Sequence, residues 1–324
     1  MKATLSTNYR ALSTEISRLT SELEDLRTQA ATGKKLNAPS DDPAAIRPVL
    51  SARSQISSTD RFIESISTAV DRLDNQDTYL DTVENLLVSA KEKAINAING
   101  TLSDADLETL ATSIGYIKEQ MISLGNSQVG GQYIFSGFLE DTQAFVADGD
   151  FVSYQGDNNI KRLEASPGEY IQTNLAGSEV FQGLKDVDGD GTLDQVGENI
   201  FDMLTNLEYA MRGYSGQDVQ LYDGSGNPVE VRHIPELTDL LGTLESSADQ
   251  VRSARGRMGN NAERLETSKS HLESVRIDLE GILSRYEDAD IVDVITEITQ
   301  TETAFKGALQ VTSQVSELSI LDYL

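Results

Sequence analysis

The sequence predicts an α+β protein in which the N- and C-terminal segments form an elongated α-helical coiled-coil rod, with a β-rich domain inserted between them. Three observations lead to this prediction. Apolar residues near both ends recur at steps of three and four, the spacing of helices that pack lengthwise on one another. Glycines, aromatic residues and short alternating runs replace this spacing in the middle. Only 38% of the 324 residues are hydrophobic and none is tryptophan, which favours thin cores over one large globule.

The first predicted helix carries a continuous apolar stripe. This N-terminal seam consists of Leu5, Tyr9, Leu12, Ile16, Leu19, Leu23, Leu26 and Ala30. A single helix cannot cover such a stripe, so we expect it to pack on another helix. Gly33 supplies a stop because glycine is the usual residue just past a helix C-terminus.

A proline-rich segment, "GKKLNAPSDDPAAIRP", separates the first helix from the second. We predict that Ser40 caps the second helix through its side-chain oxygen. Asp41 and Asp42 would then lie in the first turn, where the helix dipole favours negative charge. Pro43 is tolerated there because first-turn N–H groups have no intrahelical partner. Pro48 predicts either a kink or a fresh helix start.

Two further helices follow before the pattern changes. The second seam extends over residues 49–99, and a turn then separates it from a shorter helix in "LSDADLETLATSIGYIKEQMISLG". Ser103 is the predicted N-cap of this third helix, with Asp106 as the acid of a capping box. Its predicted inward residues are Leu107, Leu110, Ile114, Ile117, Met121 and Leu124.

The region from about 130 to 235 is predicted to hold short strands and turns. Candidate strands are "QYIFSGF", "DFVSYQG", "IKRLEA" and "YIQTNL", and "VQLYDGSGNPVEVRHI" is typical of a hairpin that turns at "GSGN". A helix is expected to interrupt the strands at "GENIFDMLTNLEYAMRGY".

Heptad spacing returns at about residue 237. One seam places Val251, Met258, Leu265, Leu272, Leu279 and Tyr286 seven residues apart, and another runs through Ile291, Val294, Ile298, Thr301, Phe305, Ala308, Thr312 and Val315. We expect the C-terminal seam to pair with the N-terminal one or with neighbouring copies of the chain. The predicted domains are terminal assembly segments (1–47 and 287–324), a helical rod (48–130 and 237–286) and a β-rich outer domain (131–236).

Charge and composition exclude several classes of partner and site. The formal net charge of −27 repels nucleic acid and anionic membranes, so neither is an expected partner. No apolar run is long enough to span a bilayer, and no secretory signal sequence is recognisable at the N-terminus. The lack of cysteine excludes disulfides and Cys-based metal sites.

The segment "KDVDGDGTLDQVGE" contains an incomplete calcium-loop pattern. Oxygen ligands on alternate residues can converge on a hard cation where glycine lets the backbone curl, as at Gly191. Gly197 occupies the twelfth position, where the pattern requires a glutamate. We therefore predict either a calcium site or a solvated turn, and the candidate ligands are Asp186, Asp188, Asp190, Thr192 and Asp194. No other metal or cofactor is expected.

No catalytic constellation is recognisable, and we predict that the protein is not an enzyme. His233 and His271 are the two histidines, and we interpret each as a surface or packing residue. Zinc-protease, nucleophile-elbow and phosphate-loop motifs are absent from the sequence. The densest basic group in the sequence, which we call the arginine group, consists of Arg252, Arg255, Arg257 and Arg264. We predict that it contacts acids such as Asp71 and Asp74 on a facing helix, contacts an adjoining subunit, or remains solvated.

Five segments in the same order resemble those of the flagellin-like axial proteins of bacterial flagella, and most of all the hook-associated protein 3 family. They are "TGKKLNAPSDDPAA", "INGTLSDADLETLATSI", "GGQYIFSGFLEDTQAF", "RGRMGNNAERLE" and "LSILDYL". The resemblance covers both terminal thirds and weakens over about 150–235. Flagellins usually have Asp-Asp-Ala-Ala-Gly where this chain has "DDPAA", and their tails also differ from "LSILDYL".

The resemblance implies a structural adaptor at the junction between hook and filament. Its implied partners are another hook-associated protein, flagellin subunits, further copies in a ring, and the flagellar export machinery with a chaperone. It also implies secretion to the extracellular flagellum and terminal helices that are disordered in the monomer. Two alternatives remain: a flagellin that forms the filament itself, and a secreted calcium-binding adhesin.

Overall fold

The computed structural model describes residues 2–99, 102–188 and 190–321. The chain divides into two compact units, one formed by Met1–Arg61 with Glu273–Leu324 and the other by Phe62–Leu272. These boundaries differ in position from the domain borders expected from the sequence, which stay a prediction. Within the described ranges, no helix is both long and apolar enough to cross a membrane.

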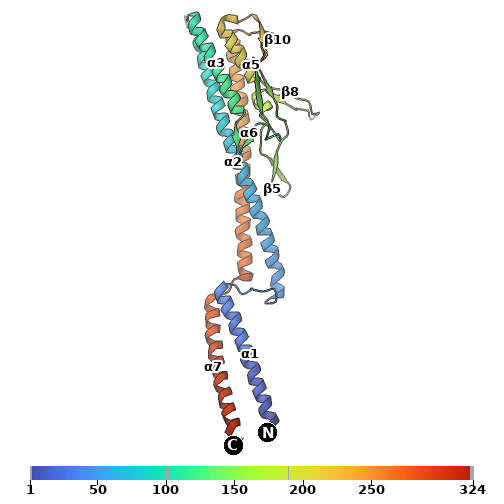
Figure 1. The fold of residues 1–324 in the computed structure, drawn as a ribbon, viewed down its shortest axis with the longest axis vertical. Coiled ribbons are helices and arrows are strands. Elements are labelled where there is room, and N and C mark those ends of the chain that lie inside the picture. Colours follow the sequence, from blue (N-terminus) through green and yellow to red (C-terminus); the bar gives the residue numbers. More distant parts are fainter. Residues whose placement is uncertain (1, 100–101, 189, 322–324) are drawn as a thin grey trace. The chain divides into compact units, whose positions relative to one another are not determined.

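The two terminal helices pack against each other in the first unit. Helix α1 (Lys2–Thr32) lies beside α7 (Ile291–Leu321), drawn in blue and red in Figure 1. Leu19, Leu23 and Leu26 of α1 are buried, and Val294 and Thr301 are buried on α7. These residues belong to the two predicted terminal seams. The N-terminal seam therefore pairs with the C-terminal seam within one chain, the first of the two predicted arrangements.

Helix α2 (Pro43–Asn99) begins at its first proline. Its cap is Asp42, whose Oδ1 accepts hydrogen bonds from the amides of Ala44 (2.9 Å) and Ala45 (3.2 Å). The predicted cap, Ser40, is wrong because Pro43 fixes the first helical position and only the preceding side chain reaches those amides. Asp41 instead closes the loop before the helix and accepts the amides of residues 37 and 38.

Pro48 lies inside α2. The predicted fresh start at Pro48 is therefore wrong, because the helix is already established five residues earlier. The alternative prediction of a kink is not tested by the helix bounds. Pro48 has no amide N–H to donate to the carbonyl of Ala44, one turn earlier in the helix.

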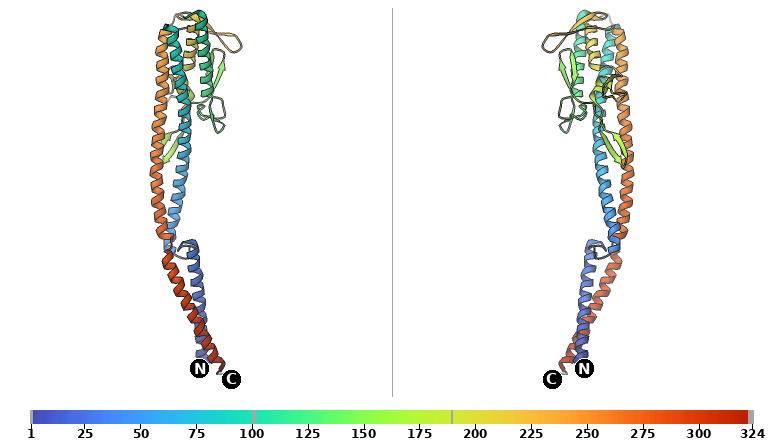
Figure 2. Two further views of the ribbon diagram at one scale, coloured as in Figure 1. Left: turned by 90° about the vertical axis from the view of Figure 1, so that its left-hand side faces the viewer. Right: turned by 90° about the vertical axis from the view of Figure 1, so that its right-hand side faces the viewer.

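Three long helices carry the second unit, whose arrangement can be followed in Figures 1 and 2. They are the part of α2 from Phe62 onward, α3 (Asp104–Gly125) and the part of α6 (Leu237–Glu287) that ends at Leu272. Ser103 and Asp106 form the predicted capping box of α3. Every seventh residue of α6 from Val251 to Leu272 is buried, but Leu279 is half-buried and Tyr286 is 38% exposed. The predicted seam thus holds through the second unit and is only partly covered beyond it.

The middle of the chain forms antiparallel hairpins rather than one continuous sheet. In the described residues each strand pairs with one neighbour, in five two-stranded sheets. The strands are β1 (Gln128–Val129), β2 (Gln132–Tyr133), β3 (Phe145–Asp148), β4 (Phe151–Tyr154), β5 (Arg162–Ser166), β6 (Glu169–Gln172), β7 (Leu184–Lys185), β8 (Asp194–Gln195), β9 (Asp218–Tyr222) and β10 (Pro228–His233). The predicted hairpin of β9 and β10 is confirmed. The predicted strand "QYIFSGF" ends after Tyr133, and a turn follows in which Gly137 adopts a positive φ of 71°.

Four buried phenylalanines join the hairpins to short helices. Helices α4 (Gly177–Phe181) and α5 (Ile200–Tyr209) pack here, and a π-helical turn, η1 (Ala210–Tyr214), continues α5. The ring centroids lie 5.1–5.7 Å apart, and most of the pairs are tilted or edge-to-face; the four residues are Phe135, Phe145, Phe181 and Phe201. This cluster gives a region of very short strands a core that the strands alone do not supply.

Candidate functional site

The terminal helices expose apolar side chains that their mutual packing does not cover. On α7, Val292 is 73% exposed and Ile295 is 54% exposed, and Leu309 and Val311 are exposed nearer its C-terminal end. Tyr9 of α1 is exposed as well. Two helices can bury only one side of each against the other, so these side chains remain in water. Apolar surface of this kind is stabilised by burial at about 25 cal/mol per Å², which favours a further partner.

A buried carboxylate fastens the loop after α1 to the end of α6. Glu287 is only 2% exposed, and its two oxygens lie 2.8 Å from Lys34 Nζ and 2.5 Å from an Arg53 guanidinium nitrogen. The backbone also bridges here, because the Lys35 amide donates to the Glu287 carbonyl at 2.7 Å. A buried carboxylate must be paired to be stable, so these contacts hold the loop after α1 and the start of α2 against the end of α6.

Glu287 was not predicted from the sequence. No clear signal was available, because Glu280 and Ser284 on the same side of α6 are polar and exposed, and of the nearest neighbours on that side only Leu283 is apolar.

The arginine group joins α6 to three other elements of the second unit. Arg252 and Arg255 meet carboxylates of α2, whereas Arg257 bonds Glu179 of α4 (2.7 Å) and Arg264 bonds Glu169 of β6 (3.1 Å). The prediction that these arginines meet acids on a facing helix is confirmed for Arg252 and Arg255. The named partners, Asp71 and Asp74, are wrong, because the register of α2 against α6 places Asp77, Asp81 and Glu84 there instead.

Arg255 is the most enclosed member of the arginine group. Its guanidinium is 2.8 Å from Asp77, 2.8 Å from Asp81 and 2.7 Å from Glu84. Hydrogen bonds from Arg252 and Arg255 lower the pKa of Glu84 against the opposing effect of burial. Charge-assisted bonds of this kind fix geometry as well as contributing stability.

Lys118 of α3 is a second buried charge that was not predicted from the sequence. Its Nζ donates to Thr205 Oγ1 (2.9 Å) and to the carbonyl of Asp150 (3.1 Å). Burial lowers the pKa of Lys118, and nearby carboxylates oppose that effect. The available signal was its spacing, because Lys118 lies between Ile117 and Met121 on the inward side of α3. Lysine occupies such positions only when partners satisfy its ammonium group.

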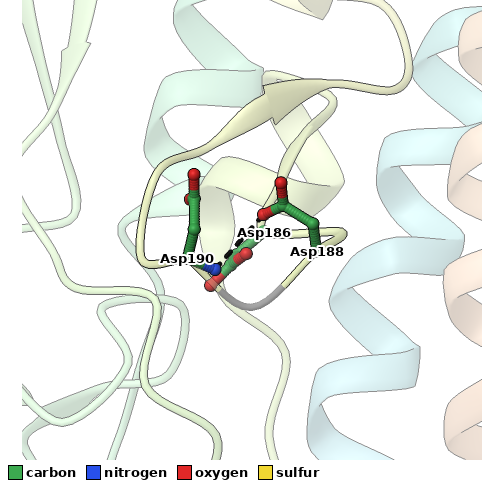
Figure 3. Close-up of side chains that lie close together, drawn as sticks. All are labelled: Asp186, Asp188 and Asp190. Carbon is green, nitrogen blue, oxygen red and sulfur yellow. Dashed lines mark hydrogen bonds between the residues drawn. The ribbon is translucent and has the colours of Figure 1, made fainter.

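The structure brings together only part of the predicted calcium loop. Asp186, Asp188 and Asp190 each offer a carboxylate oxygen, and these three oxygens lie within 4.8 Å of one another (Figure 3). All three residues are exposed. Thr192 lies beside this cluster and donates its hydroxyl to Asp190 (2.6 Å). Asp194 is not among the three clustered carboxylates and accepts the amide of Val187 (3.3 Å).

Three clustered oxygens are fewer than the six to eight that calcium takes. The loop also satisfies its own amides, since Asp186 accepts the Gly191 amide at 3.1 Å and Asp190 accepts the Thr192 amide at 2.7 Å. A solvated turn makes the same bonds. Calcium binding by Asp186, Asp188, Asp190, Thr192 and Asp194 therefore stays a prediction.

Both histidines lie at the surface. His233 Nδ1 is 2.8 Å from Asp218 on the neighbouring strand, and both side chains are exposed. His271 is exposed on α6. The contact of His233 with Asp218 does not place a nucleophile beside the imidazole, as covalent catalysis requires.

Two family models match the ends of the chain. The bacterial flagellin N-terminal helical region matches residues 5–139, and the bacterial flagellin C-terminal helical region matches residues 241–324. Together the two matches cover more than half of the chain. The chain belongs to the flagellin family. The matched ranges contain most of α1 with α2 and α3 at one end, and most of α6 with α7 at the other.

Relatives of this flagellin-family chain include proteins of two named types. Flagellar hook-associated protein 3 of Escherichia coli is 24% identical over 308 residues, 90% of each chain. Flagellin of Listeria monocytogenes is 20% identical over 288 residues, 89% of this chain and 86% of the relative. A solved Vibrio parahaemolyticus structure, assigned as flagellar hook-associated, shares the fold with a TM-score of 0.61 and 18% identity. That likeness covers 76% of this chain and all of the other.

The family matches divide the candidate sites of this flagellin-family chain. The exposed faces of α1 and α7, the Glu287 contacts and the arginine group lie in the matched ranges. The aspartate loop at 186–194 lies between the matched ranges. Surfaces that serve a function shared by the family are therefore expected on the helices of the matched ranges.

Proposed function

We propose that this chain is a structural subunit of the bacterial flagellum that acts as an adaptor at the hook–filament junction. Similarity to E. coli hook-associated protein 3 over 90% of both chains carries this proposal. The paired terminal helices support it, because they retain exposed apolar side chains such as Val292 and Ile295 that a neighbouring subunit can cover.

The proposed mechanism is mechanical. Copies associate in a ring through their terminal helices, so that the exposed apolar residues of α1 and α7 become buried in a shared core. One axial surface contacts another hook-associated protein, and the other contacts flagellin subunits. Before assembly, the chain leaves the cell unfolded through the flagellar export machinery with the help of a chaperone. The region between the matched ranges faces outward.

Electron microscopy of a deletion strain tests the junction role. Cells that lack this chain are expected to carry hooks without filaments and to release flagellin into the medium. Expression of the unaltered chain from a plasmid should restore attached filaments. Normal filaments on the deletion strain would contradict the proposal.

A flagellin role is the second candidate, supported by the 20% identity to Listeria flagellin over most of the chain. The two roles differ in whether the chain alone forms a filament. A flagellin subunit polymerises into long filaments when seeded, whereas a junction subunit adds only a limited layer. Filament length after seeding with purified chain distinguishes them. The adhesin alternative depends on the aspartate loop and has no support from the matched families.

A further inference from the structure

Helix α2 carries a basic stripe in the first unit on the side away from its packing. Its buried residues there include Ala45, Val49 and Ala52. The exposed residues on the opposite side recur at steps of three, four and seven, which places them in one line along the helix. This basic stripe consists of Arg47, Leu50, Ser54 and Arg61. Leu50, at its centre, is 58% exposed.

Helix α6 carries an acidic stripe in the same unit. Glu273, Ile277, Glu280 and Ser284 follow steps of four, three and four, so they too share one side of their helix. Ile277 is 61% exposed, and the buried Leu272 lies on another side of α6. Glu287, seven residues after Glu280, continues the line of the stripe at a buried position, where it is paired within the chain. Each stripe therefore has one large apolar residue in water between polar neighbours.

The two stripes are complementary in charge. The basic stripe holds Arg47 and Arg61, and the acidic stripe holds Glu273 and Glu280. Glu280 also lies 3.6 Å from Arg276 of its own helix. Within the described ranges, no carboxylate pairs with Arg47 or Arg61, so both remain available to a partner. Exposed apolar residues flanked by opposite charges match the anatomy of a protein interface, with an apolar centre and a polar rim.

We propose that the basic stripe of one copy binds the acidic stripe of a second copy. This inference rests on the proposed role as a self-associating subunit and names the surfaces involved. Because the two stripes differ, the contact is heterologous and continues from copy to copy. Leu50 and Ile277 are offset by roughly 15 Å along the helices of one chain, so the contact staggers neighbouring copies as a helical layer requires. The occupant of each stripe is thus another copy of this chain.

The register follows from pairing the apolar centres. Within one chain α2 and α6 are antiparallel, because Asp60 pairs with Arg276 (3.6 Å) while the earlier Arg53 pairs with the later Glu287 (2.5 Å). Parallel copies therefore meet with these helices antiparallel. Leu50 against Ile277 then places Arg47, three residues before Leu50, opposite Glu280, three residues after Ile277.

The absence of cysteine makes the contact directly testable. The variant Leu50→Cys/Ile277→Cys carries two thiols and no others. They cannot join within one chain, since a disulfide needs Cα atoms within about 7 Å. Asp60 is the residue of α2 that lies beside Arg276, next to position 277. Residue 50 is ten residues, or roughly 15 Å, from Asp60 toward the N-terminal end of α2. Oxidation of hook–filament material that contains the variant is expected to give a ladder of linked multimers.

Two controls separate the contact from general effects. In Gln55→Cys/Ile277→Cys, the first thiol lies on another exposed side of α2, and no ladder is expected. Arg47→Glu and Glu280→Arg should each reduce attached filaments about tenfold, the effect of roughly one unfavourable charge pair. The double variant should restore them. Arg162→Glu, an exposed charge reversal on β5, should leave filaments unchanged.

Failure of this contact and failure of the proposed function give different results. If the double-cysteine variant is present in hook–filament material but forms no ladder, and the double charge variant does not restore attached filaments, the contact between the two stripes is wrong. If even the unaltered chain is missing from that material, the proposed function is wrong, and the proposed contact between copies is then wrong as well.

Discussion

Arg255 shows how a single side chain can fix the register between two long helices. Its guanidinium contacts Asp77, Asp81 and Glu84, which lie at steps of four and three along one side of α2. A slip of α6 by one turn toward the N-terminal end of α2 would separate Arg255 from Glu84, the two most buried members of this set. Because unpaired buried charge is costly, the contacts exclude alternative registers that the apolar seam alone would permit.

Glu84→Gln is expected to reduce the acid sensitivity of the second unit. Hydrogen bonds from the arginines give Glu84 a lower pKa in the folded chain than in the unfolded chain. Ionised Glu84 therefore stabilises the fold above the unfolded pKa, about 4.3, and this contribution is lost as the pH falls through the lower folded pKa. Urea unfolding of both chains at pH 7 and at a series of values below pH 5 measures the difference.

The variant should be less stable than the unaltered chain at pH 7 and should approach it as the pH falls. Glu266→Gln, an exposed acid on α6, serves as the matched control and should follow the unaltered chain at every pH. A constant difference between Glu84→Gln and the unaltered chain across the whole pH range would show that Glu84 titrates as it does in the unfolded state.

At the scale of elements, the start of α2 depends on one aspartate. Asp42→Ala removes the oxygen that accepts the Ala44 and Ala45 amides, and loss of such a cap costs about 1 kcal/mol. Amide hydrogen exchange in the first turn of α2 should become about fivefold faster. Ser40→Ala is the control, because Ser40 bonds only the neighbouring Asp41 side chain. Equal effects of the two substitutions would contradict the assignment of the cap.

The aspartate loop between β7 and β8 gives a second prediction for an element. If the loop binds calcium, titration of the full chain should release heat with a Kd of roughly 10⁻⁴–10⁻³ M, because the twelfth position lacks its glutamate. Asp188→Asn/Asp190→Asn should abolish that heat and any rise in melting temperature with calcium. No heat from the unaltered chain, together with an unchanged melting temperature, would identify the loop as a solvated turn.

Sequence pattern predicted the elements better than their contacts. The heptad spacing of Val251 and Met258 and the turn chemistry at "GSGN" act locally, so the long helices and the β9–β10 hairpin could be predicted. The partners of Arg255 could not, because the register between two helices depends on all of their side chains together. Ser40 and Asp42 are both good caps, and only the backbone geometry at Pro43 distinguishes them.

At the scale of the whole molecule, the matched seams predicted that the two chain ends pair. They did not predict which residues of the seams are buried. Leu23 is buried as predicted, whereas Tyr9 of the same seam remains exposed. Periodicity identifies the side of a helix that seeks a partner, and it does not say whether that partner lies in the same chain or in another. Glu287 was not predicted because Glu280 and Ser284 on the same side of α6 are polar and exposed.

Limited proteolysis of the purified monomer tests whether the terminal helices depend on assembly. Helices α1 and α7 pack on each other and still expose Val292, Ile295 and Tyr9, so their association in a lone chain is expected to be weak. Protease should therefore trim both ends first and spare roughly residues 50–280, as mass spectrometry of the fragments would show. In hook–filament material the proposed function predicts that the same ends are protected by neighbouring copies. Ends that resist cleavage equally in the monomer would mean that one chain already stabilises them, and ordering upon assembly would be wrong.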